Sequence, residues 1–232
     1  MTTLPLPVRV ISSMATRSVL ADLVASFEQT SSIRISVEST GGVDAAKRIE
    51  AREPFDVVVL AAEVITRLAG AHCVVASSRR DLVASGIAVA VRAGDTPVDI
   101  GSEEALRHAV LNARSMGYST GPSGAHLMNL FARWGILEGI RNRLVQAPPG
   151  VPVGELLGSG KVDLGFQQLS ELMHVKEIVV LGPLPEAIQS TTIFSAARTT
   201  WSQQIAEADR FIEFIASDAA DEAKQRNGMM PV

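Results

Sequence analysis

The sequence contains a single cysteine, Cys73, among its 232 residues. One thiol cannot form an intramolecular disulfide, and no cluster of cysteine and histidine has the spacing of a zinc site. His72 is adjacent to Cys73 in sequence, but adjacency alone does not make a histidine the base that activates a thiol. We therefore interpret Cys73 as a small residue near the surface of a folded lobe, and we expect neither a metal nor another cofactor.

A strong charge of either sign is also missing. The chain has 21 Lys and Arg residues against 25 Asp and Glu residues, a formal net charge of −4, with the two signs interspersed. Proteins that bind nucleic acids usually carry a basic patch, so we expect no nucleic-acid partner. An anionic ligand stays possible, because backbone N–H groups at helix N-termini create a local positive potential without formal charge.

Membrane-spanning and targeting segments are absent as well. No apolar run is long enough to cross a bilayer, so direct insertion into a membrane is not expected. Met1 to Pro7 lacks the basic region, long apolar stretch and small-residue cleavage site of a secretory signal. The protein is expected to be periplasmic if a signal has been removed from the chain, and cytoplasmic otherwise.

The first third of the chain shows strand and helix patterns in alternation. The pattern predicts strands over 8–11, 33–37 and 55–60, and helices over 16–29, 45–51 and 63–68. Val57, Val58 and Val59 form an unbroken apolar run, which is typical of a parallel strand buried on both faces. Alternation over short loops predicts an α/β fold with mainly parallel sheets flanked by helices.

The rest of the chain continues this alternation and indicates a second lobe. We predict strands over 86–91, 142–145, 164–167, 178–181 and 189–196, and helices over 102–113, 125–134, 152–158, 170–173 and 201–216. Ser102 is expected to cap its helix. The last helix is expected to direct inward Ile205, Phe211, Ile212, Phe214 and Ile215. Residues 1–82 and 188–232 are assigned to the first lobe and 83–187 to the second, with crossing strands near 78–85 and 187–192 and a ligand cleft between the lobes.

Three loops combine hydroxyl-bearing and small residues just before predicted helices. They are Ser12-Ser13-Met14, Ser39-Thr40-Gly41-Gly42 and Ser119-Thr120-Gly121-Pro122-Ser123-Gly124. An oxyanion needs several N–H and O–H donors, and glycine lets the backbone approach it closely. Any one loop could be an ordinary cap or turn, but three at the carboxyl ends of parallel strands indicate an anion site. The third loop lacks the Gly-Lys-Ser/Thr of a phosphate-binding P-loop.

Four further side chains are candidates for the same site. Arg17 could bind a carboxylate with two N–H groups, or it could be a solvated surface arginine. His126 could donate to an anion or transfer a proton, and a capping role is equally open. Gln167 could contact the ligand or the backbone, and Glu171 could be a general base if its surroundings exclude water.

The order of these units and loops resembles the molybdate-binding-protein-like members of the type 2 periplasmic-binding-protein family. The resemblance implies a two-lobed substrate-binding protein of an ABC transporter. In that family a serine after the first strand and one after the second hold a tetrahedral oxyanion, and Ser12 or Ser13 and Ser39 match those positions. The usual Ala-Ala-Ser-Leu reads Ser-Ser-Met-Ala here, and a late tyrosine is replaced around Phe166-Gln167-Gln168. The ligand could therefore be molybdate-like or an organic carboxylate.

Two functions follow from this resemblance. The first is capture of a small anion between two lobes, with the membrane component of an ABC transporter as the implied partner. The alternative is an enzyme like aconitate isomerase, which has the same fold and moves a proton on a polycarboxylate. In that case His126 and Glu171 would be the catalytic groups, since one group must remove a proton and one must return it.

Overall fold

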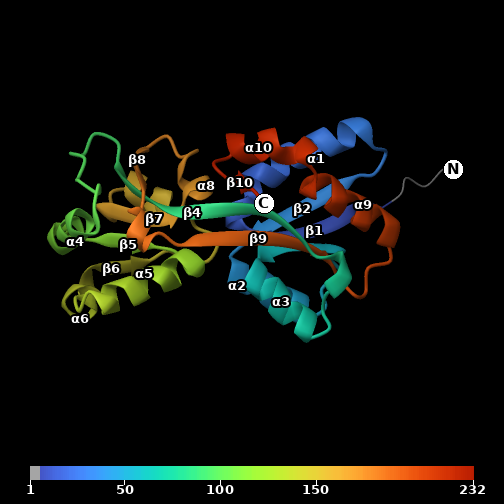
Figure 1. The fold of residues 1–232 in the computed structure, drawn as a ribbon, viewed down its shortest axis with the longest axis horizontal. Helices are drawn as coiled ribbons and strands as arrows, with labels where there is room; N and C mark the ends of the chain where they lie inside the picture. Colours follow the sequence, from blue (N-terminus) through green and yellow to red (C-terminus); the bar gives the residue numbers. More distant parts are fainter. Residues whose placement is uncertain (1–5) are drawn as a thin grey trace. The chain divides into compact units, whose positions relative to one another are not determined.

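The computed structural model describes residues 6–232, and the chain divides into two compact units (Figure 1). Unit 1 comprises the residues up to Ala84 together with Ile193–Val232, and unit 2 comprises Ser85–Thr192. The chain passes between the units twice, within strand β4 (Arg80–Arg92) and within strand β9 (Thr191–Arg198). Residues 1–5, part of the segment in which no secretory signal is visible, lie outside the described residues.

Unit 1 is built on a mixed sheet whose strand order is β2-β1-β3-β9. The first three strands are parallel, β9 is antiparallel to β3, and β10 pairs with the start of β4. The strands are β1 (Val8–Ser13), β2 (Ile35–Thr40), β3 (Val57–Ala61) and β10 (Met230–Pro231). The helices are α1 (Arg17–Thr30), α2 (Gly42–Glu50), α3 (Ala62–Gly70), α9 (Ile205–Ala216) and α10 (Asp221–Arg226).

Strand β3 shows how the unit 1 sheet divides two hydrophobic cores. Val57 and Val59 pack into the core shared with α1, α9 and α10, whereas Val58 and Leu60 pack into the core shared with α2 and α3. Successive side chains of a strand point to opposite faces, so a strand covered on both sides needs an apolar residue at every position. The unbroken apolar run therefore reflects helices on both faces of the sheet.

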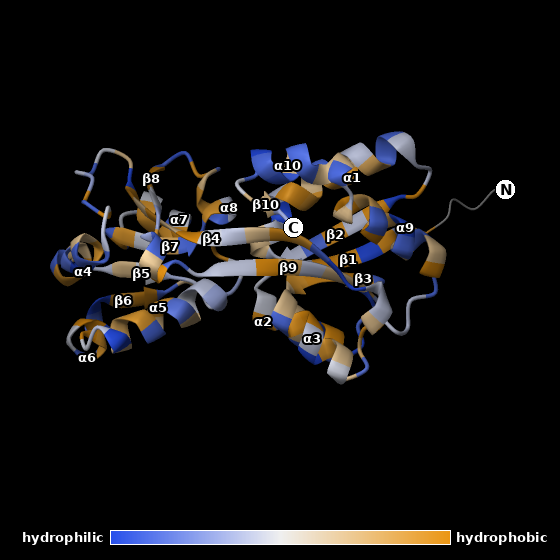
Figure 2. Cartoon of the chain, in the orientation of Figure 1, coloured by the Kyte–Doolittle hydropathy of each residue, from blue (hydrophilic) through white to orange (hydrophobic). Residues whose placement is uncertain are grey.

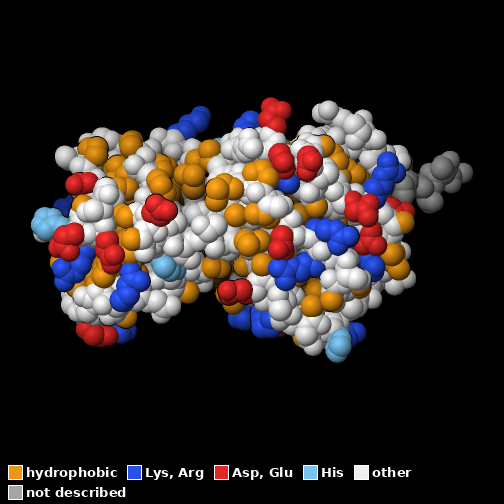
Figure 3. All heavy atoms as spheres, in the orientation of Figure 1, with side chains coloured by type: hydrophobic (Ala, Val, Ile, Leu, Met, Phe, Trp, Pro, Cys, Tyr) orange, Lys and Arg blue, Asp and Glu red, His pale blue; other side chains and the backbone are white. Residues whose placement is uncertain are grey.

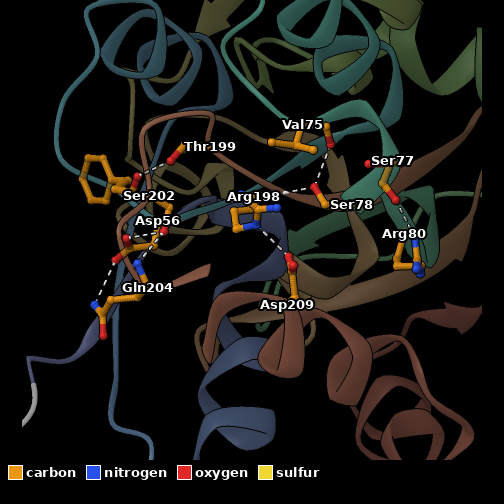
Figure 4. A network of polar contacts seen from close by, with 11 residues as sticks. Asp56, Val75, Ser77, Ser78, Arg80, Arg198, Thr199, Ser202, Gln204 and Asp209 are labelled. Carbon is orange, nitrogen blue, oxygen red and sulfur yellow. Dashed lines mark hydrogen bonds and ion pairs between the residues drawn. The ribbon is translucent and has the colours of Figure 1, made fainter. Parts of the chain in front are cut away.

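A polar network fastens the start of β3 to the segment after β9 (Figure 4). The Asp56 carboxylate accepts hydrogen bonds from the Ser202 hydroxyl at 2.7 Å and from the Arg9 amide at 2.9 Å. The Arg198 guanidinium pairs with Asp209 of α9 at 2.8 Å. Arg198 is the register partner of Val57, the first residue of β3, so this network lies at the amino end of the parallel strands. We assign it a structural role.

Unit 2 repeats the layered arrangement with a sheet of order β4-β7-β5-β6. Strands β5, β6 and β7 are parallel, and β4 is antiparallel to both β7 and β8. The strands are β5 (Met116–Tyr118), β6 (Leu144–Gln146), β7 (Leu164–Gln168) and β8 (Ile178–Pro183). The helices are α4 (Glu103–Asn112), α5 (Pro122–Arg133), α6 (Leu137–Ile140), α7 (Val153–Gly158) and α8 (Leu169–Leu172).

Two cores cover the two faces of the unit 2 sheet. Ile87 and Val89 of β4 pack with α4 and α5, while Ala88 and Ala90 pack with α7 and α8. In Figure 2, α5 shows hydrophilic residues alternating with hydrophobic ones, as expected for a helix with one buried face. Five short 3₁₀ turns complete the described elements: Met14–Thr16, Ala76–Ser78, Arg141–Arg143, Glu186–Ile188 and Asp218–Ala220.

The sequence pattern located the helices and strands well but misplaced some residues. The Ser102 cap is confirmed, since the Ala105 amide donates to the Ser102 hydroxyl at 3.1 Å. The last long helix begins at Ile205, not at residue 201, and Ile205 is 53% exposed rather than inward. Cys73, expected near the surface, is buried beside α2 and α3. Ile205 is the first residue of α9, so its side chain lies before the turns that pack on the core. The helical spacing of apolar residues therefore wrongly predicted that it points inward.

Helix α5 also begins earlier than expected, at Pro122 instead of residue 125. Proline fits the first helical position because its missing N–H would have no partner there. Ser123 and Gly124 thus belong to the first turn of α5 and not to the loop before it.

Candidate functional site

The carboxyl ends of β1, β2 and β3 meet at one edge of unit 1. The register pairs Ser12 with Ser39 and Ser13 with Thr40, so the two predicted serine loops leave the sheet side by side. A 3₁₀ turn from Met14 and then α1 follow β1, α2 follows β2 after Gly41 alone, and α3 follows β3 directly. Three chain segments therefore begin a helix or turn at this edge.

The serine hydroxyls at this edge are close together and mostly buried. The Ser12 and Ser39 hydroxyl oxygens lie 2.8 Å apart and share a hydrogen bond. The neighbouring Ser13 hydroxyl is buried and has no hydrogen-bond partner among the described residues. Such a group typically costs about 1–3 kcal/mol, so it is a donor for which a ligand oxygen would be a favourable acceptor.

The Ser13 side chain lies beside the start of helix α2. A methyl group placed on Gly42 would lie 3.8 Å from the Ser13 Cβ, in ordinary van der Waals contact. Helix α2 has Gly41 at its N-cap and no side-chain cap. The first N–H groups of a helix lack intrahelical partners and favour negative charge nearby. Ser12, Ser13, Ser39 and the α2 N-terminus thus form one set of donors, which we call the serine edge.

Two further predicted residues of unit 1, Met14 and Arg17, follow β1. Arg17 is the first residue of α1 and is exposed, and it makes no hydrogen bond or ion pair with the serine edge. Met14 is half-buried and opens the 3₁₀ turn after β1. The structure therefore brings the predicted serines together but shows no contact from the predicted arginine.

In unit 2 the carboxyl ends of β5 and β7 also lie side by side. Tyr118 and Phe166 are register partners, so the loop from Ser119 and the segment from Gln167 leave adjacent strands. The Ser119 and Ser123 hydroxyl oxygens are 2.8 Å apart, and the Gly121 amide donates to the Ser119 hydroxyl at 3.3 Å. Thr120 in the same loop is half-buried.

Gly124 is required by the close packing of this loop. A Cβ atom at this position would lie 1.9 Å from the carbonyl oxygen of Ser119, a distance that real atoms do not adopt. The absence of a side chain lets the first turn of α5 press against the end of β5. Gly124 therefore shapes the loop instead of contacting a ligand through a side chain.

Gln167 uses both polar atoms of its buried amide within the protein. Its Oε1 accepts from the Val153 amide at the start of α7, at 2.7 Å, and its Nε2 donates to Glu171 Oε2 at 2.6 Å. Gln167 thus fixes the position of Glu171 relative to α7. The sequence singled out both residues but gave no sign that they bond to each other.

Glu171 is a candidate residue whose pKa is raised well above its usual value. Burial raises the pKa of the Glu171 carboxyl to about 7, against a smaller lowering by the hydrogen bond from Gln167. The residue as a whole is half-buried, and burial of its carboxyl group is the main cause of the shift. A carboxyl group that changes protonation near neutral pH can exchange protons with a ligand.

Ser170, between these residues, was missed by the sequence reasoning. Its hydroxyl is buried and makes no hydrogen bond among the described residues. A serine within a short helix carries no motif, so only its position after the carboxyl end of β7 could have drawn attention to it.

His126 lies on α5 and is half-buried. Its Nε2 lies 2.9 Å from the carbonyl oxygen of Ile188, which accepts a hydrogen bond from that nitrogen. This bond fixes the tautomer and leaves only Nδ1 for a ligand.

A pocket of unit 2 lies away from these residues. It has a volume of about 800 Å³ and is lined by residues that include Asp95, Asp99, Glu104 and Asp163. Asp163 precedes the first residue of β7, so the pocket is at the amino end of that strand, opposite Gln167. Arg114 also lines the pocket but pairs with Asp163, and Asp95 pairs with Arg92, so these cations are already matched by carboxylates and we place no anion there.

The described residues, 6–232, have mixed surface charge and no metal-binding cluster. No group of three or more His, Cys, Asp and Glu side chains in that range could hold a metal ion. None of the described helices has the length and apolar character to cross a bilayer. On the visible face of each unit, acidic and basic side chains are interspersed (Figure 3).

A two-unit α/β chain with donor sets at the carboxyl ends of its strands has the features of a solute-binding protein. The chain belongs to the bacterial extracellular solute-binding protein family, whose profile matches residues 8–230. The resemblance noted from the sequence is thereby confirmed.

The relatives include an enzyme and proteins that bind inorganic anions. The chain is 31% identical over 229 residues to an aconitate isomerase from Pseudomonas sp, a match that spans 96% of this chain and 87% of the relative. Among solved structures it resembles the periplasmic molybdate-binding protein of Azotobacter vinelandii, at 18% identity with a TM-score of 0.81, covering 96% and 98% of the two chains. It also resembles the sulfate-binding protein SubI of Mycobacterium tuberculosis, at 15% identity with a TM-score of 0.75, covering 98% and 88%. These structures establish the α/β fold of periplasmic binding proteins, as predicted.

Proposed function

We propose that this solute-binding protein captures a small anion at the serine edge. The supporting observation is the buried Ser13 hydroxyl, which has no partner and lies beside the α2 N-terminus and the Ser12–Ser39 pair. Hydroxyl and N–H donors in a buried setting bind oxyanions and carboxylates without a formal positive charge. The same donors suit either chemical class.

An organic carboxylate is the preferred ligand class. The sequence is closer to the aconitate isomerase relative, at 31% identity, than to the molybdate-binding structure, at 18%. We further propose that the protein works outside the cytoplasm, as the family description suggests. We also propose that it delivers its ligand to the membrane component of an ABC transporter, because it resembles the substrate-binding domain of a putative molybdenum ABC transporter.

Calorimetric titration tests this function. Purified protein is titrated with citrate, cis-aconitate, trans-aconitate, molybdate, tungstate and sulfate. We expect one of these to bind, and Ser13→Ala to weaken its binding roughly 10- to 100-fold, because a hydrogen bond to a charged group contributes about 1.5–3 kcal/mol. The exposed Ser77, also in unit 1, provides a matched control, and Ser77→Ala should bind normally. Failure of all six anions to bind would refute the proposal.

The raised pKa of Glu171 favours a second function. General acid and base catalysis is most effective when the pKa of the group lies near the working pH, and Glu171 meets that condition. We propose as an alternative that the protein isomerises aconitate, with Glu171 and His126 moving the proton.

Deuterium exchange distinguishes the alternative from simple binding. Incubation with cis-aconitate in deuterated buffer should give trans-aconitate or incorporate solvent deuterium catalytically. Glu171→Gln should lower the rate by roughly 100-fold or more. Absence of both product and exchange would exclude the isomerase while leaving anion binding intact.

A further inference from the structure

The Ser12 hydroxyl, in unit 1, lies within reach of two acceptors. Its oxygen is 2.8 Å from the Ser39 hydroxyl oxygen, and either of these two groups can donate to the other. The same hydroxyl is 3.3 Å from the carbonyl oxygen of Ser13, to which it can also donate. A hydroxyl carries one proton, so Ser12 cannot donate to both acceptors at once. Two arrangements of the hydroxyl protons are therefore open to the serine edge.

The two arrangements differ in what Ser39 offers to a ligand. If Ser12 donates to the Ser13 carbonyl, Ser39 donates to Ser12, and the Ser39 proton is used within the protein. If Ser12 donates to Ser39 instead, the Ser39 proton is free for a ligand oxygen. The bond given up in this second arrangement is the long one, at 3.3 Å, which lies beyond the usual range for two oxygens. The second arrangement therefore costs little.

Thr16 makes the second arrangement easier to adopt. Its hydroxyl donates to the same Ser13 carbonyl oxygen at 3.2 Å. An acceptor that already receives a hydrogen bond loses less when another donor turns away than an acceptor left without one. Thr16 thus supplies the Ser13 carbonyl, and Ser12 is released to donate to Ser39.

Burial separates the group that can meet a ligand from the groups behind it. Ser12 is 0% exposed and Thr16 is 1% exposed, whereas Ser39 is half-buried. Ser39 is also the residue nearest the end of β2, two positions before Gly41 at the N-cap of α2. Within this chain of hydroxyls, Ser39 is therefore the member on the ligand side.

We propose that Thr16 and Ser12 are positioning residues of the serine edge, which direct the Ser39 proton toward the anion without touching it. An anionic oxygen only accepts hydrogen bonds, so it is stabilised by the arrangement in which Ser39 donates. Donation from Ser12 also polarises the Ser39 hydroxyl and makes it a stronger donor. This inference rests on the proposed anion-binding function and adds to it how its donors are oriented.

Thr16→Val tests the role of the residue farthest from the ligand. Valine keeps the branched shape of threonine but lacks the hydroxyl, so Ser12 should turn its proton to the Ser13 carbonyl. We expect calorimetry with citrate, the two aconitates, molybdate, tungstate and sulfate to show binding of the preferred anion weakened roughly 3- to 10-fold. Thr16→Ser restores the hydroxyl and should restore wild-type affinity.

Thr30→Val is the matched control for this substitution. The Thr30 hydroxyl makes the same kind of bond, to the carbonyl oxygen of the residue three positions earlier, Phe27, at 3.3 Å. Thr30 is the last residue of α1, whereas Thr16 immediately precedes that helix. Thr30→Val should therefore bind the anion as the wild type does.

A double-mutant cycle separates positioning from direct contact. Ser39→Ala should weaken binding roughly 10- to 100-fold, because it removes the donor itself. Ser12→Ala should weaken binding roughly 2- to 10-fold, because Ser39 loses the group that orients it. If Ser12 acts only through Ser39, the double variant should bind no more weakly than Ser39→Ala. A direct contact from Ser12 would instead make the two effects multiply.

The possible results separate this inference from the proposed function. Wild-type affinity in Thr16→Val, or multiplying effects of Ser12→Ala and Ser39→Ala, would overturn the positioning role and leave anion binding standing. Failure of the wild type to bind any of the six anions would overturn both. If Thr16→Val does not fold, the cycle between Ser12 and Ser39 decides the matter.

Discussion

Ser13 and Ser170 share an unusual condition, because each is a buried serine whose hydroxyl makes no hydrogen bond among the described residues. Buried polar groups are satisfied in the great majority of cases, so each exception calls for an explanation. Ser13 follows the end of β1 beside α2, and Ser170 follows the end of β7. Each lies at the carboxyl end of a parallel strand of its own unit, which is where the proposed anion site of unit 1 also lies.

The sequence predicted Ser12, Ser13 and Ser39 as candidates but could not rank them. Which hydroxyl pairs within the protein depends on strand register, and register is fixed by pairing between distant segments. Likewise, Gln167 was predicted to contact the ligand or the backbone and Glu171 to act as a base, while their mutual bond follows from the direct passage of β7 into α8. The residue types predicted groups that could bind an anion, but only the three-dimensional structure shows which of them hydrogen-bond to each other.

Glu171→Gln should alter how stability depends on pH. The pKa of Glu171 is raised in the folded state from 4.5 to about 7, so the unfolded chain ionises first. The free energy of unfolding should therefore fall as the pH rises from about 4.5 to about 7, by at most about 3 kcal/mol from this group.

Urea unfolding at pH 5 and pH 8 measures this dependence. Glu171→Gln should lose less stability between these pH values than the wild type, and the exposed Glu155→Gln should behave like the wild type. Identical losses in wild type and Glu171→Gln would show that Glu171 titrates normally.

Helices and strands were predicted from sequence because their signals are local. The apolar run Val57–Leu60 predicted a strand covered on both faces, and Ser102 predicted a helix N-cap. The structure confirms both. Strand direction was not predictable in the same way. Strands β4, β8 and β9 run antiparallel to their neighbours, and a strand's own hydrophobic pattern is the same in either direction.

The contact between α5 and the end of β5 gives a test at this scale. Gly124→Ala would place its methyl group 1.9 Å from the Ser119 carbonyl oxygen, so the first turn of α5 must move. We expect a loss of about 1–3 kcal/mol in the free energy of unfolding. Gly139→Ala in α6 meets no atom within 4 Å and should be neutral or slightly stabilising. Equal effects of the two changes in thermal unfolding would contradict the proposed close packing.

For the whole molecule, the alternation of strands and helices correctly indicated an α/β chain of the periplasmic-binding type. The chain enters unit 2 within β4 and leaves it within β9, so unit 2 is one continuous segment and unit 1 is not. Both crossings fall inside a strand, so no loop or linker in the sequence marks them.

Ligand binding should raise the stability of the whole protein. A ligand present at 100 times its Kd stabilises the native state by about 2.7 kcal/mol, because it binds the folded chain only. Thermal unfolding with the anion identified by calorimetry should show a higher midpoint for the wild type and a smaller increase for Ser13→Ala. An equal increase in both would argue against the serine edge as the binding site.

The division of unit 1 between the two ends of the chain bears on how the protein is made. During synthesis every residue of unit 2 leaves the ribosome before Ile193–Val232, the segment that supplies β9, α9 and α10. Until that segment emerges, β3 lacks its antiparallel neighbour and α1 lacks the aromatic side chains of α9 that pack on Phe27. During synthesis, unit 2 can therefore fold before unit 1, although unit 1 contains the first residues of the chain.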